Sequence, residues 1–206
     1  MVQIPVIYPP SPQPIASFDF VNLAEGTGTV IYFGITSNDT GSLSYHLVSN
    51  SAVWSSTVET TRGTEGTTTV DFDSAKFNLP RFVKGTAFFS GAIGSTSNPG
   101  SRSHLQVQLK KWDGSSETNL TAEVTGIETQ ASGGRQEFYV MPITTENLIK
   151  KGEQLRLTVK LVQDGGSAFN HSFAHDPANT DGAIIVPSTQ KTTTIMRMLV
   201  PFRIES

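Results

Sequence analysis

The stretch "QLRLTVKLVQ", residues 154–163, decides the fold class of this chain. Apolar and polar residues alternate along it, so its hydrophobic pattern has a period of two. Because successive side chains of a strand point to opposite faces of a sheet, this period predicts a strand with one buried and one solvated face. The residues expected to be buried are Leu155, Leu157, Val159 and Leu161.

The same alternation recurs in "HLQVQLKKW" (104–112) and in "TIMRMLVPFRIES" (194–206). Pro201 cannot donate to a sheet ladder, so it predicts an edge position or a bulge in the last of these strands. The pair Asp113-Gly114 predicts the tight turn of a hairpin. Weaker strands are expected near residues 16–23, 29–36, 43–49, 68–73, 82–92, 118–128 and 136–143.

The composition supports strands and excludes several classes of protein. Charged residues make up 16% of the chain, whereas helical surfaces are usually rich in Lys and Glu. The net charge of −3, without a cluster of Lys or Arg, argues against direct binding of nucleic acid. The absence of cysteine excludes disulfides and thiolate metal sites. No apolar run is long enough to span a membrane, and the first residues lack the pattern of a signal peptide.

Many short strands without a βαβ rhythm predict an all-β fold. We expect an antiparallel two-sheet sandwich of jelly-roll-like topology, in which each strand buries one face. Only "TTENLIKKG", residues 144–152, is expected to form a short helix, with a Thr at its start and Gly152 at its end. We expect one domain over residues 15–206, although residues 15–79 are less regular and could form a small subdomain.

Residues 1–14 are rich in proline, which blocks helix and removes ladder donors, so we expect an extended N-terminal arm. The segment also carries apolar residues that a solvated linker does not need. Two interpretations stay open: a disordered tail, or an arm that lies along a neighbouring subunit. The candidate intersubunit contacts are Ile4, Val6, Ile7 and Tyr8.

The stretch "NHSFAHDPANTDG", residues 170–182, holds the side chains most typical of chemistry, namely His171, His175 and Asp176. A metal site, an acid–base pair and a plain surface loop are all conceivable there. The surrounding glycines and Pro177 make a helix improbable, so the spacing of the two histidines has no special geometry. We favour a long surface loop between strands, and we predict neither a metal nor a cofactor.

Other candidate sites are weaker. Asp71 and Asp73 share one face of a strand, but a Ca²⁺ site would need several more oxygen ligands. Trp54 and Trp112 could form a platform for sugars, or Trp112 could close the end of a core. Neither a G-x-S-x-G elbow nor a phosphate-binding Walker loop is present. We therefore predict no catalytic residues and expect that the chain is not an enzyme.

A series of motifs between Phe77 and Ile204 resembles β proteins encoded among the virion genes of tailed bacteriophages. The motifs, in order, are "FNLPRFVKGTAFFSGAIG", "LQVQLKKWDGSSET", "FYVMPITTENLIKKGEQLRLTVKL", "HDP" and "LVPFRI". The resemblance implies a capsid decoration, or cement, protein with a jelly-roll-like fold. It implies no active-site residues.

On this resemblance we expect a non-enzymatic virion structural protein on the capsid surface, assembled in the host cytoplasm. It would stabilise the shell through contacts with the major capsid protein and with copies of itself, and we expect a homotrimer, in keeping with closed cyclic symmetry. The alternatives are a carbohydrate-binding β-sandwich module and a component of the phage tail or baseplate.

Overall fold

The computed structural model describes residues 28–38, 41–50, 59–62, 64–95, 102–128, 133–164, 171–175 and 196–203. Every regular element in these ranges is a strand, so the predicted all-β class is confirmed. None of the described residues forms a helix that could cross a membrane. The strands are β1 (Thr29–Ser37), β2 (Ser44–Val48), β3 (Glu59–Arg62), β4 (Gly66–Ser74), β5 (Arg81–Ser95), β6 (Arg102–Trp112), β7 (Glu117–Asn119), β8 (Val124–Thr125), β9 (Gly133–Ile149), β10 (Gln154–Asp164), β11 (His171–Ala174) and β12 (Arg197–Arg203).

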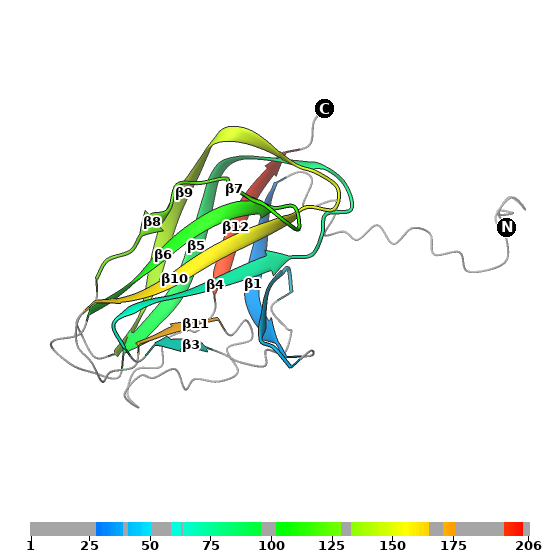
Figure 1. Ribbon diagram of the computed structural model, residues 1–206. Helices are drawn as coiled ribbons and strands as arrows, with labels where there is room; N and C mark the ends of the chain where they lie inside the picture. The colour runs from blue at the N-terminus through cyan, green and yellow to red at the C-terminus, as the bar shows by residue number, and fades with distance from the viewer. Residues whose placement is uncertain are drawn as a thin grey trace, which may run out of the picture.

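The described strands form one hydrogen-bonded path in the order β3-β11-β5-β12-β1-β2-β4-β10-β6-β7 (Figure 1). Two further strands join its sides, because β9 pairs with β5 and β8 pairs with β6. The pairs are antiparallel except β2 with β4, which run parallel through His46–Asp73 and Leu47–Ser74. The sheet is therefore mixed, whereas a purely antiparallel arrangement was expected.

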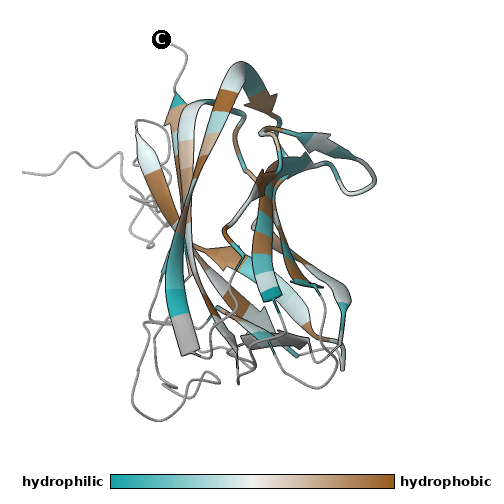
Figure 2. Ribbon diagram, turned by 90° about the vertical axis from the view of Figure 1, so that its left-hand side faces the viewer, coloured by the Kyte–Doolittle hydropathy of each residue, from teal (hydrophilic) through white to brown (hydrophobic). Residues whose placement is uncertain are grey.

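The path curves so that strands far apart along it enclose a common core (Figure 2). The four inward residues predicted from "QLRLTVKLVQ" are all buried in that core. They meet side chains from the other half of the path, including Phe89 of β5 and Tyr139 of β9. The hydroxyl of Tyr139 reaches across to the carbonyl of Leu105 on β6, at 3.5 Å. One apolar face of the curved sheet thus supplies the core.

The expected helix at 144–152 is wrong. Residues up to Ile149 continue β9, which pairs there with the start of β5 through Arg81–Ile149 and Phe82–Leu148. The chain then turns at Gly152, whose φ of 88° suits glycine. Pairing with β5 and burial of Ile149 outweigh the weak local preference for helix.

The expectation of a surface loop is wrong for residues 171–175. Residues 171–174 form β11, which lies between β3 and β5 and is buried along its whole length. Neither β11 nor β3 was predicted. Both are four residues long, and runs of that length are too short to show a clear period.

Two local predictions are confirmed. Pro201 lies at a register shift between β12 and β5, so the bulge occurs, although β12 is an inner strand and not an edge. Residues 113–116 form the turn of a hairpin, because Trp112 pairs with Glu117. The carboxylate of Asp113 accepts hydrogen bonds from the backbone N–H groups of Ser115 and Ser116, at 2.8 and 2.7 Å.

Candidate functional site

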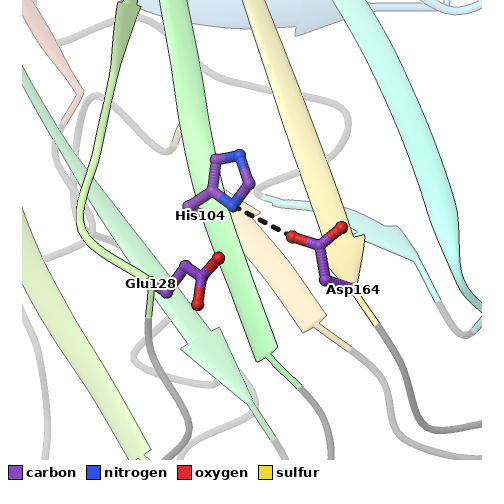
Figure 3. Close-up of side chains that lie close together, drawn as sticks. All are labelled: His104, Glu128 and Asp164. Atoms are coloured by element: carbon purple, nitrogen blue, oxygen red, sulfur yellow. Dashed lines mark ion pairs between the residues drawn. The ribbon is translucent and has the colours of Figure 1, made fainter.

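Three side chains meet at one end of the sheet, where β6 begins and β10 ends (Figure 3). His104 lies on β6, Asp164 is the last residue of β10, and Glu128 follows β8. The strand ladder brings them together, since His104 pairs with Val162 and Gln106 pairs with Thr125. His104 and Asp164 belong to the outward-facing set of their strands, because the inward residues of both have odd numbers.

The atoms of this cluster are close enough to share one ligand. Nδ1 of His104 lies 3.4 Å from Oδ2 of Asp164. One atom from each of the three side chains lies within 4.8 Å of the other two. An imidazole nitrogen with two carboxylates is a set of donors that can hold a divalent metal ion.

Burial differs sharply within the cluster. The His104 side chain is 9% exposed and that of Asp164 is 50% exposed. Nδ1 of His104 is buried and has no hydrogen-bond partner, while its Nε2 lies 3.4 Å from the Nε2 of Gln106. Arg102, the first residue of β6, lies 3.3 Å from the Glu128 carboxylate, so this acid is held toward the start of that strand.

A second feature is apolar and covers the outer side of four adjacent strands, β1, β12, β5 and β9. One cross-strand row consists of Ile31, Leu199, Phe88 and Val140, as the pairings Ile31–Leu199, Leu199–Phe88 and Phe88–Val140 show. The next row consists of Phe33, Arg197, Ser90 and Phe138. We call these eight residues the apolar face.

Three apolar side chains on β5 and β9 are the most exposed of the apolar face. Phe138 is 79% exposed, Val140 is 56% exposed and Phe88 is 45% exposed. Arg197 is the one charged residue among the eight. Contiguous exposed apolar surface on a soluble domain marks a site of interaction.

A half-open groove of about 560 Å³ adjoins the apolar face and is lined by residues of β8, β9 and the segment that follows β8, among them Ile127 and Phe138. Beneath it, Glu137 accepts a hydrogen bond from the Tyr139 hydroxyl and forms an ion pair with Arg135. Burial and the Glu137 carboxylate raise the pKa of Tyr139, so this phenol stays protonated. The buried acid is therefore compensated within the protein.

The opposite outer face, over β4, β10, β6 and β7, is charged and internally paired. Arg156 forms a bidentate ion pair with Asp73, at 2.7 and 2.6 Å, and reaches Glu117 at 2.8 Å. Its guanidinium also lies 4.2 Å from the centroid of the Trp112 ring. Lys110 contacts Glu117 at 2.7 Å. We call these five residues the Arg156 network.

This network accounts for two of the sequence-based candidates. Asp73 is paired with Arg156, and Asp71 accepts a hydrogen bond from the Thr158 hydroxyl at 2.6 Å. Both acids therefore bind partners on the neighbouring strand β10, and the described residues give no sign of a shared Ca²⁺ site between them. Trp112 lies beneath Arg156 and is not an open platform for sugars. Trp54 falls outside the described residues.

Of the predicted loop candidates, the structure describes His171 and His175. His175 is fully buried, contacts the rings of Phe72 and Phe173, and lies 3.1 Å from the hydroxyl of Thr60. Burial lowers the pKa of His171, which favours its neutral form. Asp176 and the arm candidates Ile4, Val6, Ile7 and Tyr8 lie outside the described residues. Sequence reasoning missed His104, Glu128 and Asp164, which no local motif connects.

Comparison with known proteins gives distant structural likenesses. No protein-family model and no curated protein matches the chain. An α-amino acid ester hydrolase matches 66% of it at 10% identity, with a TM-score of 0.46. Two structures of a CocE/NonD family hydrolase from Staphylococcus aureus match 83% and 84% of it, at 9% and 8% identity, with TM-scores of 0.42 and 0.44. The chain spans only 25% to 36% of the length of these proteins.

These matches contradict two expectations drawn from the sequence. The predicted function, a non-enzymatic virion decoration protein with a sugar-binding or tail-component alternative, is wrong on this comparison, because the matched proteins are hydrolases. The prediction that the chain is not an enzyme is contradicted by the same finding. At this level of likeness the matches assign neither an activity nor a catalytic residue to the chain. The predicted partners and the virion location stay predictions.

Proposed function

We propose that this chain is a self-associating module, in which the apolar face of one copy binds the N-terminal arm of a neighbouring copy. The observation that carries the proposal is the pair of cross-strand rows with Phe88, Phe138 and Val140 exposed. A sheet face that stays in water is normally lined with polar residues. Six of the eight residues of the apolar face are apolar instead.

The arm suits this face chemically. Residues 1–18 contain no charged side chain, and they include the apolar residues Ile4, Val6, Ile7 and Tyr8. Proline-rich segments are already extended, so they lose little conformational entropy when they dock on aromatic surfaces. The aromatic rings of the apolar face provide such a surface.

The attachment of the arm also suits docking. The carbonyl of Gly28 accepts a hydrogen bond from the backbone N–H of Phe202 at 2.9 Å, so β1 starts beside β12 at the margin of the apolar face. Residues 15–27, which join the arm to this point, can span at most about 45 Å. Four neighbouring strands are only about 15 Å across. The connection is therefore long enough to carry the arm to another copy.

We further propose that the fold is a jelly-roll-like two-sheet sandwich over residues 15–206, with the arm preceding it. The main core cluster of the described residues, which draws side chains from both halves of the strand path, supports this arrangement. In such a fold the outer side of one sheet stays available for a partner. Exchange of arms among copies can close a ring of cyclic symmetry, and we propose a trimer as its state.

Light scattering on the purified full-length chain, over a range of concentrations, tests the proposal. We expect an oligomer that becomes a monomer when residues 1–14 are deleted, and a dissociation constant at least about 30-fold weaker for Phe138→Asp. Leu79→Asp is the matched control, because Leu79 is also an exposed apolar residue but lies outside the apolar face. It should leave the oligomer intact.

Three results would overturn the proposal. A full-length chain that stays monomeric means that the arm does not join copies. An oligomer that survives Phe138→Asp does not use the apolar face, and one that survives the deletion does not use the arm. Circular dichroism of each variant confirms that the fold is kept.

A further inference from the structure

We propose that His104, Asp164 and Glu128 form a binding site for one divalent transition-metal ion such as Zn²⁺. This site lies at the start of β6 and the end of β10, and it is independent of the apolar face. No local sequence motif connects these three residues, and metal binding would be a property separate from self-association.

The spacing of the donor atoms fits a single ion. Zn²⁺ binds imidazole nitrogen and carboxylate oxygen at about 2.0–2.2 Å, so two ligands of a tetrahedral ion lie about 3.4 Å apart. Nδ1 of His104 and Oδ2 of Asp164 are 3.4 Å apart. One Glu128 oxygen lies within 4.8 Å of a donor atom of each of the other two side chains, and rotation of this exposed side chain can shorten those distances.

The buried imidazole provides the independent second observation. Nδ1 of His104 is shielded from water and lacks a hydrogen-bond partner, although it points toward the Asp164 carboxylate (Figure 3). A buried polar atom without a hydrogen-bond partner carries a free-energy penalty. A metal ion at this position would bind the nitrogen lone pair and remove that penalty.

The groups around the imidazole can set its tautomer for metal binding. Coordination through Nδ1 requires the proton to be on Nε2, and the Gln106 side chain lies next to that atom at 3.4 Å. With its amide oxygen turned toward Nε2, Gln106 accepts a hydrogen bond from the Nε2–H group and fixes the ring, as partners of metal-bound histidines do. Amide orientation is decided by such bonds, so this arrangement needs no movement of the backbone.

Charge and access also suit a cation. Two carboxylates face the His104 imidazole, and one of them, Glu128, also forms an ion pair with Arg102 at 3.3 Å. Both acids are half exposed, so an ion can enter from solvent and keep water as a further ligand. The imidazole favours a transition metal over Ca²⁺ or Mg²⁺, which prefer oxygen ligands throughout.

Titration of the metal-free full-length protein with Zn²⁺ by calorimetry tests the site, and Co²⁺ provides a visible absorption band that reports coordination. We expect one ion per chain, and affinity at least about tenfold weaker in Asp164→Asn, Glu128→Gln and His104→Gln. Asp164→Asn and Glu128→Gln change exposed residues, so they remain informative if His104→Gln fails to fold.

Matched controls are Glu146→Gln and His46→Gln, which remove an acid and a histidine outside the cluster and should bind as the wild type does. The proposal is overturned if Zn²⁺ gives no binding heat and Co²⁺ no band. It is also overturned if Asp164→Asn and Glu128→Gln bind Zn²⁺ as tightly as the wild type, because the ion then lies elsewhere. None of these results depends on the oligomeric state.

Discussion

The two outer faces of this sheet differ in how their side chains are satisfied. Over β4, β10, β6 and β7 the charges are paired within the chain, with Arg156 bound to Asp73 and Glu117 and stacked on Trp112. Over β1, β12, β5 and β9, large apolar side chains face solvent without a cover among the described residues. Both faces belong to strands with the same alternation, so alternation alone does not distinguish them.

This difference indicates which of the two faces is suited to binding a partner. A charged face whose ions pair with one another gains little from a partner, because its hydrogen bonds are already made. An apolar face still has transfer free energy available, at roughly 25 cal/mol per Å² buried. Assembly is therefore expected on the β5–β9 side, and three further predictions probe the contrast.

The largest difference in the free energy of unfolding is expected between two neighbouring residues of β5, Phe89 and Phe88, whose side chains point to opposite faces of the sheet. Phe89 is fully buried and packs on Tyr139, with ring centroids 5.5 Å apart, so Phe89→Ala should lower the free energy of unfolding by about 3–5 kcal/mol. Phe88→Ala on the apolar face should lower it by about 1 kcal/mol or less. Urea unfolding at low protein concentration measures both, and equal losses would contradict the assigned faces.

A smaller effect is expected on the charged face. Arg156→Ala removes two ion pairs and the contact with Trp112 from partly buried surroundings, and should be destabilising by about 1–3 kcal/mol. Arg203→Ala removes one exposed pair with Glu146, and should cost at most a few tenths of a kcal/mol. Thermal or urea unfolding separates the two variants. Similar losses would show that the Arg156 network contributes no more than an ordinary surface pair.

The smallest effect concerns pH. Hydrogen bonds from Lys110 and then Arg156 lower the pKa of Glu117 below its ordinary value of 4.5. A carboxyl with a lowered folded-state pKa stabilises the protein above the unfolded value, and this stability is lost as pH falls through the folded value. As the pH falls below 4.5, we expect Glu117→Gln to lose less stability than the wild type. The difference between their losses in the free energy of unfolding should be about 1 kcal/mol or less.

The control for this pH profile comes from the other face. Phe88→Ala removes no titratable group, so its stability should change with acid in parallel with that of the wild type. Unfolding midpoints measured between neutral and acidic pH provide the comparison. A Glu117→Gln profile parallel to the wild type would contradict a contribution of this carboxylate.

Sequence patterns predicted elements best where the alternation was long. The residues of "QLRLTVKLVQ" occupy β10 with the expected face inward, because burial and pleat both have a period of two. The pattern failed at residues 144–149, where pairing with β5 extends β9. It failed also at β11, whose four residues are all buried and show no alternation.

The candidate sites were less predictable than the strands. His171 and His175 attracted attention because they are close in sequence, yet β11 places them in a buried region near Phe173. His104 and Asp164 are 60 positions apart, and only the pairing of β6 with β10 brings them together. Spacing along the chain is informative for sites within one element, but it says little about sites shared by several strands.

The sequence by itself determined the all-β class, the inward residues of the long strands, the hairpin at Asp113-Gly114 and the bulge at Pro201. These features depend on neighbours within a few positions, where pleat, turn geometry and missing donors act directly. Tertiary structure alone decided the strand order, the parallel pairing of β2 with β4, the apolar face and the meeting of His104, Asp164 and Glu128. Those features depend on which distant strands share hydrogen bonds, and a local pattern of period two is compatible with many such pairings.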